Sequence, residues 1–176
     1  YMTKKKIEIL APAKDLLHGM AAINSGADAV YIGAPQFGAR SNAHNSMEDV
    51  AALVQYAHLY HAQVFVVINT ILYDNELETC RQMIWELYHI GVDALIIQDM
   101  AIMEMELPPI VLHASTQANN RDANHVKFLA DAGMKRVVLA RELNLDQIKE
   151  ISEASDVELE FFVSGALCVS FSGNCY

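Results

Sequence analysis

Short apolar runs alternate along this chain with longer segments whose apolar residues recur at helical spacing. Each run has the length of a buried strand, and each longer segment has the period of a helix with one buried face. The predicted strands lie at residues 7–10, within 26–33, at 64–68 and 94–97, from 111 onward, and at 137–139 and 161–163. The predicted helices lie at residues 15–25, after 46, at 76–90, at 122–132 and after 144, and residues 100–105 form at most two helical turns.

A repeated pattern supports this alternation. The form that begins Gly26-Ala27-Asp28 recurs from Gly91 and, more loosely, from Gly133. In each copy a glycine follows a predicted helix, and a β-branched strand follows after a short turn. Ser46 and Asn144 are suitable N-caps for two of the helices, each with a capping-box partner three residues later.

The order of elements predicts an α/β fold with a parallel sheet. No Gly-x-Gly-x-x-Gly follows the first strand, so we expect a (β/α)8 TIM-type barrel and not a dinucleotide-binding sheet. About seven strands and six helices leave this barrel incomplete. We therefore expect residues 1–176 to be the N-terminal part of a single barrel domain whose remainder is absent. The open sheet edge could pair with a second copy, so a homo-oligomer is one expectation.

Composition narrows the class of protein. No apolar run approaches the roughly 18 residues needed to span a membrane, and the first residues lack the apolar core of a signal peptide. Three cysteines at irregular spacing form no disulfide framework, so we expect a soluble cytoplasmic protein. The net charge of -10 is unusual for a protein that binds nucleic acid, and the only basic cluster in the sequence is Lys4–Lys6.

In a barrel of this kind the active site is built from the loops that follow the strands. The polar candidates at such positions are Asn69, Gln98, His113, Ser115, Thr116, Gln117, Arg141 and Glu142, together with Arg40 in the long loop after the second strand.

Each candidate also has a structural interpretation. His113 could be a general acid or base, or a hydrogen-bonded histidine of the core. Ser115 and Thr116 could bind substrate or cap a helix. Arg40 could clamp an anion or pair with a surface acid, and Arg141 with Glu142 could be an anion clamp or an internal ion pair.

Two of the three cysteines, Cys168 and Cys175, follow the last predicted strand. Six residues separate them, which is wider than the spacing of ordinary zinc hairpins, whereas iron–sulfur clusters tolerate more varied spacing. The alternative is that one or both are small buried hydrophobic residues. Cys80 lies on the apolar stripe of a predicted helix and is expected in the core.

The end of the chain carries a longer motif: Glu160-x-Phe162-x-x-Gly165-Ala166-Leu167-Cys168, four residues, and Gly173-x-Cys175. This motif resembles the signature of the U32 family, first named as collagenase-like peptidases. Arg40-x-x-Ala43, Gln117 and Arg141-Glu142 also resemble recurrent positions of that family, and the resemblance extends over residues 7–176. Within the family the chain resembles the branch that makes 5-hydroxycytidine in 23S rRNA.

The resemblance implies an oxygen-independent, iron–sulfur-dependent hydroxylation of an RNA base. Cys168 and Cys175 would be two ligands of a [4Fe-4S] cluster, and the other two cysteines would lie downstream of this chain. Prephenate would supply the oxygen atom, with Arg40 and Arg141 as clamps for its carboxylates. We expect His113, Gln117, Arg141 and Glu142 in catalytic roles, and Arg40, Asn69, Gln98, Ser115 and Thr116 in substrate binding.

The partners implied are rRNA and a small dicarboxylate, and most phosphate contacts would come from outside this acidic chain. We expect this chain alone to be inactive and to hold no cluster. The alternative function is a collagenase-like peptidase with Cys168 as nucleophile and His113 as base. The sequence contains neither the His-Glu-x-x-His of zinc proteases nor the Gly-x-Ser-x-Gly of serine hydrolases.

Overall fold

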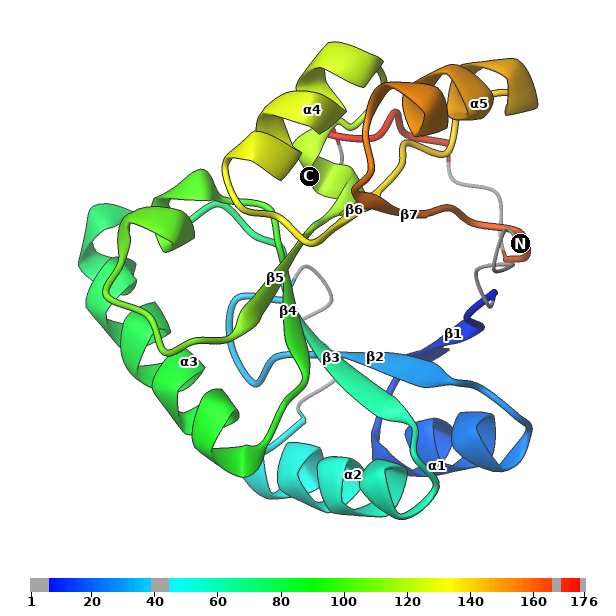
Figure 1. Ribbon diagram of the computed structural model, residues 1–176. Helices are drawn as coiled ribbons and strands as arrows, with labels where there is room; N and C mark the ends of the chain where they lie inside the picture. The colour runs from blue at the N-terminus through cyan, green and yellow to red at the C-terminus, as the bar shows by residue number, and fades with distance from the viewer. Residues whose placement is uncertain (1–6, 39–44, 166–168, 175–176) are drawn as a thin grey trace.

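The computed structural model describes residues 7–38, 45–165 and 169–174. Within these ranges seven parallel strands form one curled sheet, and each strand pairs with the next along the chain (Figure 1). The strands are β1 (Leu10–Ala13), β2 (Ala29–Gly33), β3 (Gln63–Ile68), β4 (Ala94–Ile97), β5 (Val111–Ala114), β6 (Arg136–Val138) and β7 (Glu158–Glu160). The architecture is an incomplete TIM-type barrel, as predicted.

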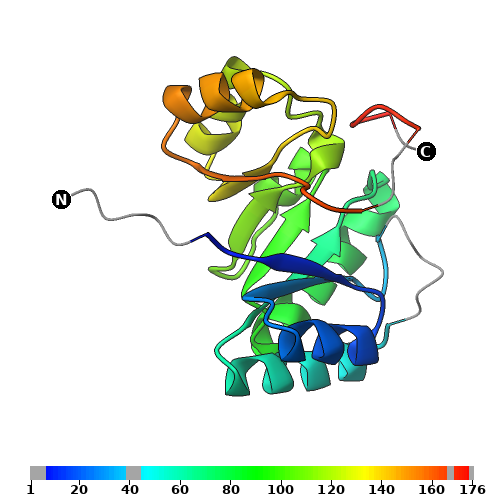
Figure 2. The same ribbon diagram turned by 90° about the vertical axis from the view of Figure 1, so that its right-hand side faces the viewer.

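Helices cover the outside of the curled sheet. They are α1 (Leu16–Asn24), α2 (Met47–Leu59), α3 (Leu77–Ile90), α4 (Ala123–Asp131) and α5 (Leu145–Ala154). Three 3-10 turns, η1 (Asp74–Glu76), η2 (Met100–Glu104) and η3 (Thr116–Ala118), complete the connections, and η2 is the short segment predicted before the prolines. Figure 2 shows α1 beside α2 at one end of the view and α4 beside α5 at the other. None of the described helices is both long and apolar enough to cross a membrane.

Side-chain capping sets the helix starts that the sequence predicts. Ser46 and Asn144 each form a capping box with the residue at the third helical position, because donors of the first turn lack intrahelical partners. The glycines of the repeat lie just after the C-terminal ends of helices. Gly26, Gly91 and Gly133 have φ values of 98°, 95° and 114°, a left-handed conformation that a Cβ atom disfavours.

The aspartates of the repeat connect neighbouring strands. The carboxylate of Asp28 accepts a hydrogen bond from the backbone N–H of Ile9 at 3.0 Å, and that of Asp93 accepts one from Val64 N–H at 2.8 Å. Each carboxylate thus satisfies a donor beside the start of the adjacent strand. The looser third copy has Lys135 at this position, which can make no such contact.

Two predicted strands are shifted in the structure. The first was expected at residues 7–10 and runs from Leu10 to Ala13, because pairing with β2 places Leu10 opposite Ala29. The prediction of a buried strand at residues 161–163 is wrong. Pairing with β6 selects Glu158–Glu160 instead, and the side chains of Phe161, Phe162 and Val163 lie exposed beyond the strand end.

The strands present alternate residues to two apolar layers. The larger layer lies between sheet and helices and includes Val30, Val66, Leu95, Ile84 and Cys80. Cys80 is fully buried and its pKa is raised to about 11, chiefly by desolvation, so it is a core thiol as predicted. A smaller cluster, with Phe65 at its centre, lines the inner face of the sheet.

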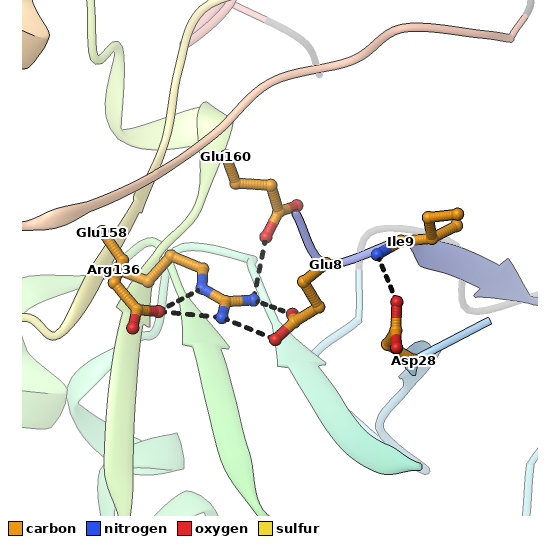
Figure 3. A network of polar contacts seen from close by, with 6 residues as sticks. All are labelled: Glu8, Ile9, Asp28, Arg136, Glu158 and Glu160. Carbon is orange, nitrogen blue, oxygen red and sulfur yellow. Dashed lines mark hydrogen bonds and ion pairs between the residues drawn. The ribbon is translucent and has the colours of Figure 1, made fainter. Parts of the chain in front are cut away.

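The inner face also carries a charged network around Arg136. Its guanidinium pairs with Glu8 at 2.6 Å, with Glu158 at 2.8 Å and with Glu160 at 3.7 Å (Figure 3). The guanidinium lies over the ring of Phe65, 5.2 Å from its centroid. The contact with Glu8 joins the segment before β1 to β6 and so bridges the open side of the barrel between β1 and β7.

His113 belongs to this interior and not to a loop. It is the third residue of β5, is 4% exposed, and packs edge-on against Phe65 with ring centroids 4.8 Å apart. Desolvation, helped by the positive charge of Arg136, lowers the pKa of His113 to about 3. Burial acts in the opposite sense on an acid and raises the pKa of Glu160 to about 7, although Arg136 opposes that rise. His113 is therefore uncharged near neutral pH, and Glu160 is protonated in about half of the molecules.

These shifts predict a pH dependence of stability. A histidine with a lowered folded-state pKa stabilises the fold above its unfolded pKa, and this contribution is lost as pH falls, because only the unfolded chain takes up the proton. Between pH 7 and pH 5 the loss from His113 should be about 2 kcal/mol. Over the same pH range Glu160 has the opposite effect on stability, because its raised pKa makes the folded state bind more protons than the unfolded chain.

Chemical denaturation of the wild type and of His113→Leu at both pH values isolates the histidine, because Glu160 is present in both proteins. The free energy of unfolding of the wild type should fall relative to that of the variant as the solution is acidified. Equal pH dependence in the two proteins would contradict a neutral, buried His113.

Candidate functional site at the carboxyl ends of β5, β6 and β7

A short segment, residues 169–174, lies across the loops that follow β5 and β6, close to the starts of α4 and α5 (Figure 1). Its central residue is Ser172, which is 1% exposed. The flanking residues Val169 and Phe171 are 101% and 61% exposed. Ser172 is the one fully buried residue of this segment, so the main attachment of the segment is polar and not an apolar face.

Every polar group of Ser172 has a partner. Its backbone N–H donates to Oε1 of Glu142 at 2.5 Å, and its carbonyl accepts from Nη2 of Arg121 at 2.9 Å. Its Oγ accepts from the backbone N–H of Arg141 at 3.3 Å and lies 3.3 Å from Oγ1 of Thr116. The Thr116 hydroxyl is also 3.2 Å from the carbonyl of Leu139, beside the end of β6.

Arg121 and Glu142 complete the attachment. Their side chains lie 3.8 Å apart, so the two charges that hold Ser172 also attract each other. Partial burial acts to raise the pKa of Glu142, but the hydrogen bonds from Ser172 and the charge of Arg121 outweigh it, and the pKa is lowered. Glu142 is thus an ionised acceptor at neutral pH. The Arg121 guanidinium also lies over the ring of Phe171, 5.4 Å from its centroid.

Gly173 allows the segment to come this close. Its φ is +84°, and a Cβ atom placed on it would lie 2.7 Å from Cβ of Asn119. Asn119 itself ends η3 in a left-handed conformation, with φ of 62°. A side chain at position 173 would therefore force the two turns apart.

Asn120 connects the ends of β5 and β6 below this contact. The residue is fully buried, and its Nδ2 donates to the carbonyls of Ser115 and Val138 at 2.9 and 2.7 Å. The backbone carbonyl of Asn120 accepts a hydrogen bond from Ala140 N–H at 3.0 Å. Asn120, Arg121 and Ser172 were not among the residues that the sequence predicts for the site. The polar run Asn119–Arg121 directly before the N-cap Asp122 is the sequence signal that could have marked two of them.

The structure brings together three of the predicted site residues, Thr116, Arg141 and Glu142, around Ser172. Ser115 lies beside them but is buried as the N-cap of η3, where its Oγ accepts from Gln117 N–H at 3.1 Å. The capping interpretation of Ser115 is thus confirmed. The side-chain oxygen Oε1 of Gln117 is buried without a hydrogen-bond partner in the described part of the chain.

Other predicted residues lie elsewhere. His113 lies within β5 on the inner face of the sheet, so its expected place beyond the strand end is wrong, because β5 continues to Ala114. Asn69 follows β3 and Gln98 follows β4, and both are partly buried. Asn45, which the sequence did not single out, is buried and donates from Nδ2 to the carbonyls of Lys14 and Gly33 at 3.2 and 3.3 Å.

Arg40, Cys168 and Cys175 lie outside the described residues, so the predictions made for them stay predictions. Within the described ranges, no group of three or more His, Cys, Asp or Glu side chains is arranged to hold a metal ion. In the sequence, Cys168 and Cys175 flank residues 169–174, and thiolates are the ligands that soft metals and iron–sulfur clusters prefer.

Comparison with solved structures supports the barrel assignment. The structure of the U32 peptidase Mk0906 superposes with a TM-score of 0.75 over 92% of this chain and 70% of that chain, at 14% sequence identity. At this identity the likeness shows a shared fold and carries no information about activity.

Three curated relatives align with nearly the whole chain. The 23S rRNA 5-hydroxycytidine C2501 synthase of Escherichia coli is 55% identical over 175 residues, covering 99% of this chain and 27% of the relative. An uncharacterized protease of Methanocaldococcus jannaschii is 40% identical over 97% of this chain and 43% of the relative. The tRNA hydroxylation protein P1 of Bacillus subtilis is 37% identical over 97% of this chain and 42% of the relative.

The chain thus spans between 27% and 43% of the length of these relatives. A family model described as peptidase family U32 matches residues 14–176. Because this match and the identities cover almost every residue, the chain belongs to peptidase family U32.

Proposed function

We propose that this chain is part of a longer U32 enzyme that hydroxylates a base of RNA, with a cytidine of 23S rRNA as its target. The observation that carries the proposal is the 55% identity with the 23S rRNA 5-hydroxycytidine synthase over 99% of the chain. Identity falls to 37% with a relative named for tRNA hydroxylation. The difference favours rRNA over tRNA as substrate, and both relatives favour base hydroxylation as the reaction.

In this proposal Cys168 and Cys175 are two ligands of a [4Fe-4S] cluster. Thiolates are the usual ligands of such clusters, and both cysteines flank a segment that is fixed to the carboxyl ends of the strands. When bound, the cluster would supply one-electron redox chemistry near the mouth of the barrel. The remaining two ligands would come from residues beyond this chain.

Prephenate is proposed as the oxygen donor, and its carboxylates need cationic partners. Arg141 is suited to that role because its guanidinium is exposed at the carboxyl end of β6. Its only hydrogen bond to the described residues is a long one, 3.4 Å, to the carbonyl of Ser170, so most of its five donors stay available there. Arg40 is the second proposed clamp.

A peptidase that uses Cys168 and His113 is the competing function, and one relative is named as a protease. The environment of His113 weighs against it. A ring that is buried inside the barrel, with a pKa of about 3, is a poor base for a thiol near neutral pH.

The cluster proposal predicts iron in the full-length protein purified without oxygen. About four irons and four sulfides per chain are expected, lost together when Cys168 and Cys175 are both changed to Ser. Cys80→Ala is the matched control and should keep its iron, because that thiol is buried in the core. Iron and acid-labile sulfide analysis makes the measurement. A parent protein without iron would contradict the proposal and return attention to the cysteine nucleophile.

The clamp proposal predicts that Arg141→Lys lowers RNA hydroxylation in the full-length enzyme. Lysine keeps the charge and the backbone contact to Ser172 but loses the two-pronged geometry that a carboxylate fits. A loss of roughly tenfold is expected, equivalent to one charge-assisted hydrogen bond. Mass spectrometry of RNA nucleosides at varied donor concentration measures it.

Arg81→Lys, on the exposed face of α3 where Arg81 pairs with Glu78, is the control and should behave as wild type. Unchanged hydroxylation in Arg141→Lys would rule out the clamp.

A further inference from the structure

The segment between Cys168 and Cys175 has little apolar contact to hold it in place. Val169 and Phe171 are exposed, and so is Asn174. A hydrogen bond from Asn174 N–H to the carbonyl of Phe171, at 3.1 Å, closes a local turn but does not attach that turn to the barrel. The position of the segment therefore depends on the buried polar residue at its centre.

Ser172 supplies that attachment through both backbone polar groups and its hydroxyl. Its N–H, its carbonyl and its Oγ contact Glu142, Arg121 and the Arg141 backbone, respectively. Two of these contacts involve a charged partner, the stronger class of hydrogen bond. The Thr116 hydroxyl adds a contact from a different loop. All of these contacts lie within the chain, and none of them needs a bound metal.

The partners are themselves fixed by the fold. Thr116 begins η3 behind the capping residue Ser115, and Arg121 directly precedes the N-cap of α4. Asn120, between them in the chain, binds the ends of β5 and β6 together. Gly173 then brings the turn against Asn119 at a separation that leaves no space for a side chain. These contacts together define one position for the segment on the barrel.

We propose that Thr116, Arg121 and Glu142 are positioning residues, which hold Ser172 and thereby fix the segment that links the two cluster cysteines. Ser172 is four residues after Cys168 and three residues before Cys175. Fixing it reduces the conformational entropy that the chain loses when both thiolates bind one cluster. The inference rests on the proposed cluster, and it gives Thr116 and Glu142 a different task from contact with the RNA base.

The test uses the full-length protein purified without oxygen, with the variants Glu142→Ala, Ser172→Ala and Thr116→Val. Two readouts are needed besides activity. The first is the rate at which iron is lost to an excess of chelator, followed by the visible absorption of the cluster. The second is hydrogen–deuterium exchange of the peptide that contains residues 169–174.

Iron loss should accelerate about tenfold or more in Glu142→Ala, the scale on which outer-shell partners affect metal affinity. The increase should be smaller in Ser172→Ala, which removes the hydroxyl contacts but keeps the backbone contacts to Glu142 and Arg121. Exchange in residues 169–174 should rise in the same variants. Thr116→Ser, which keeps the hydroxyl, should match the wild type where Thr116→Val does not. Glu78→Ala is the control, because it removes another Glu–Arg pair on the exposed face of α3 and should change neither readout.

The outcomes separate this inference from the proposed function. Iron loss and hydrogen–deuterium exchange within twofold of wild type in Glu142→Ala would overturn the proposed positioning role. If the full-length protein contains no iron but hydrogen–deuterium exchange is still faster in the variants, the positioning role of these residues would be supported and the proposed cluster would be overturned. An unchanged melting temperature in variants that lose iron faster would support positioning over a general loss of stability.

Discussion

Parallel pairing of each strand with its successor is the constraint on which the rest of this molecule depends. It places all seven carboxyl ends at one side of the sheet, so the loops that follow the strands meet there. Thr116 and Ser172 are 56 residues apart in the chain and touch only for this reason. The same constraint directs the helices outward and leaves the inner face to a separate set of side chains.

That inner face combines apolar packing with charge. Arg136 is surrounded by three acids and one aromatic ring, and His113 lies next to the same ring. Ion pairs that are taken out of water stabilise little unless their hydrogen bonds are completed. Here Arg136 stays paired with Glu8 and Glu158, whereas Glu160 and His113 respond to burial through opposite pKa shifts. The interior keeps one cation and limits the number of uncompensated charges around it.

Local sequence information was enough to predict the alternation, the capping boxes at Ser46 and Asn144, and the glycines that end three helices. It failed where pairing between strands decides the outcome. The apolar residues Phe161–Val163 look like a strand, but the register with β6 selects Glu158–Glu160, whose acids face Arg136. Ser172 was not singled out, and the polar run before Asp122 gave only a weak signal for Arg121, because the importance of both residues comes from contacts between distant loops. Thr116 and Glu142 were found as polar strand-end residues, although their observed partner was not foreseen.

The ion pair between Glu8 and Arg136 has a consequence for the order of folding. The two residues are 128 positions apart in the chain, so during synthesis the pair cannot form until Arg136 has emerged from the ribosome. The strand pairs impose no such delay, since each new strand needs only the strand made just before it. The sheet can therefore grow in the direction of translation, whereas the contact between Glu8 and Arg136 cannot form before β6 has been made.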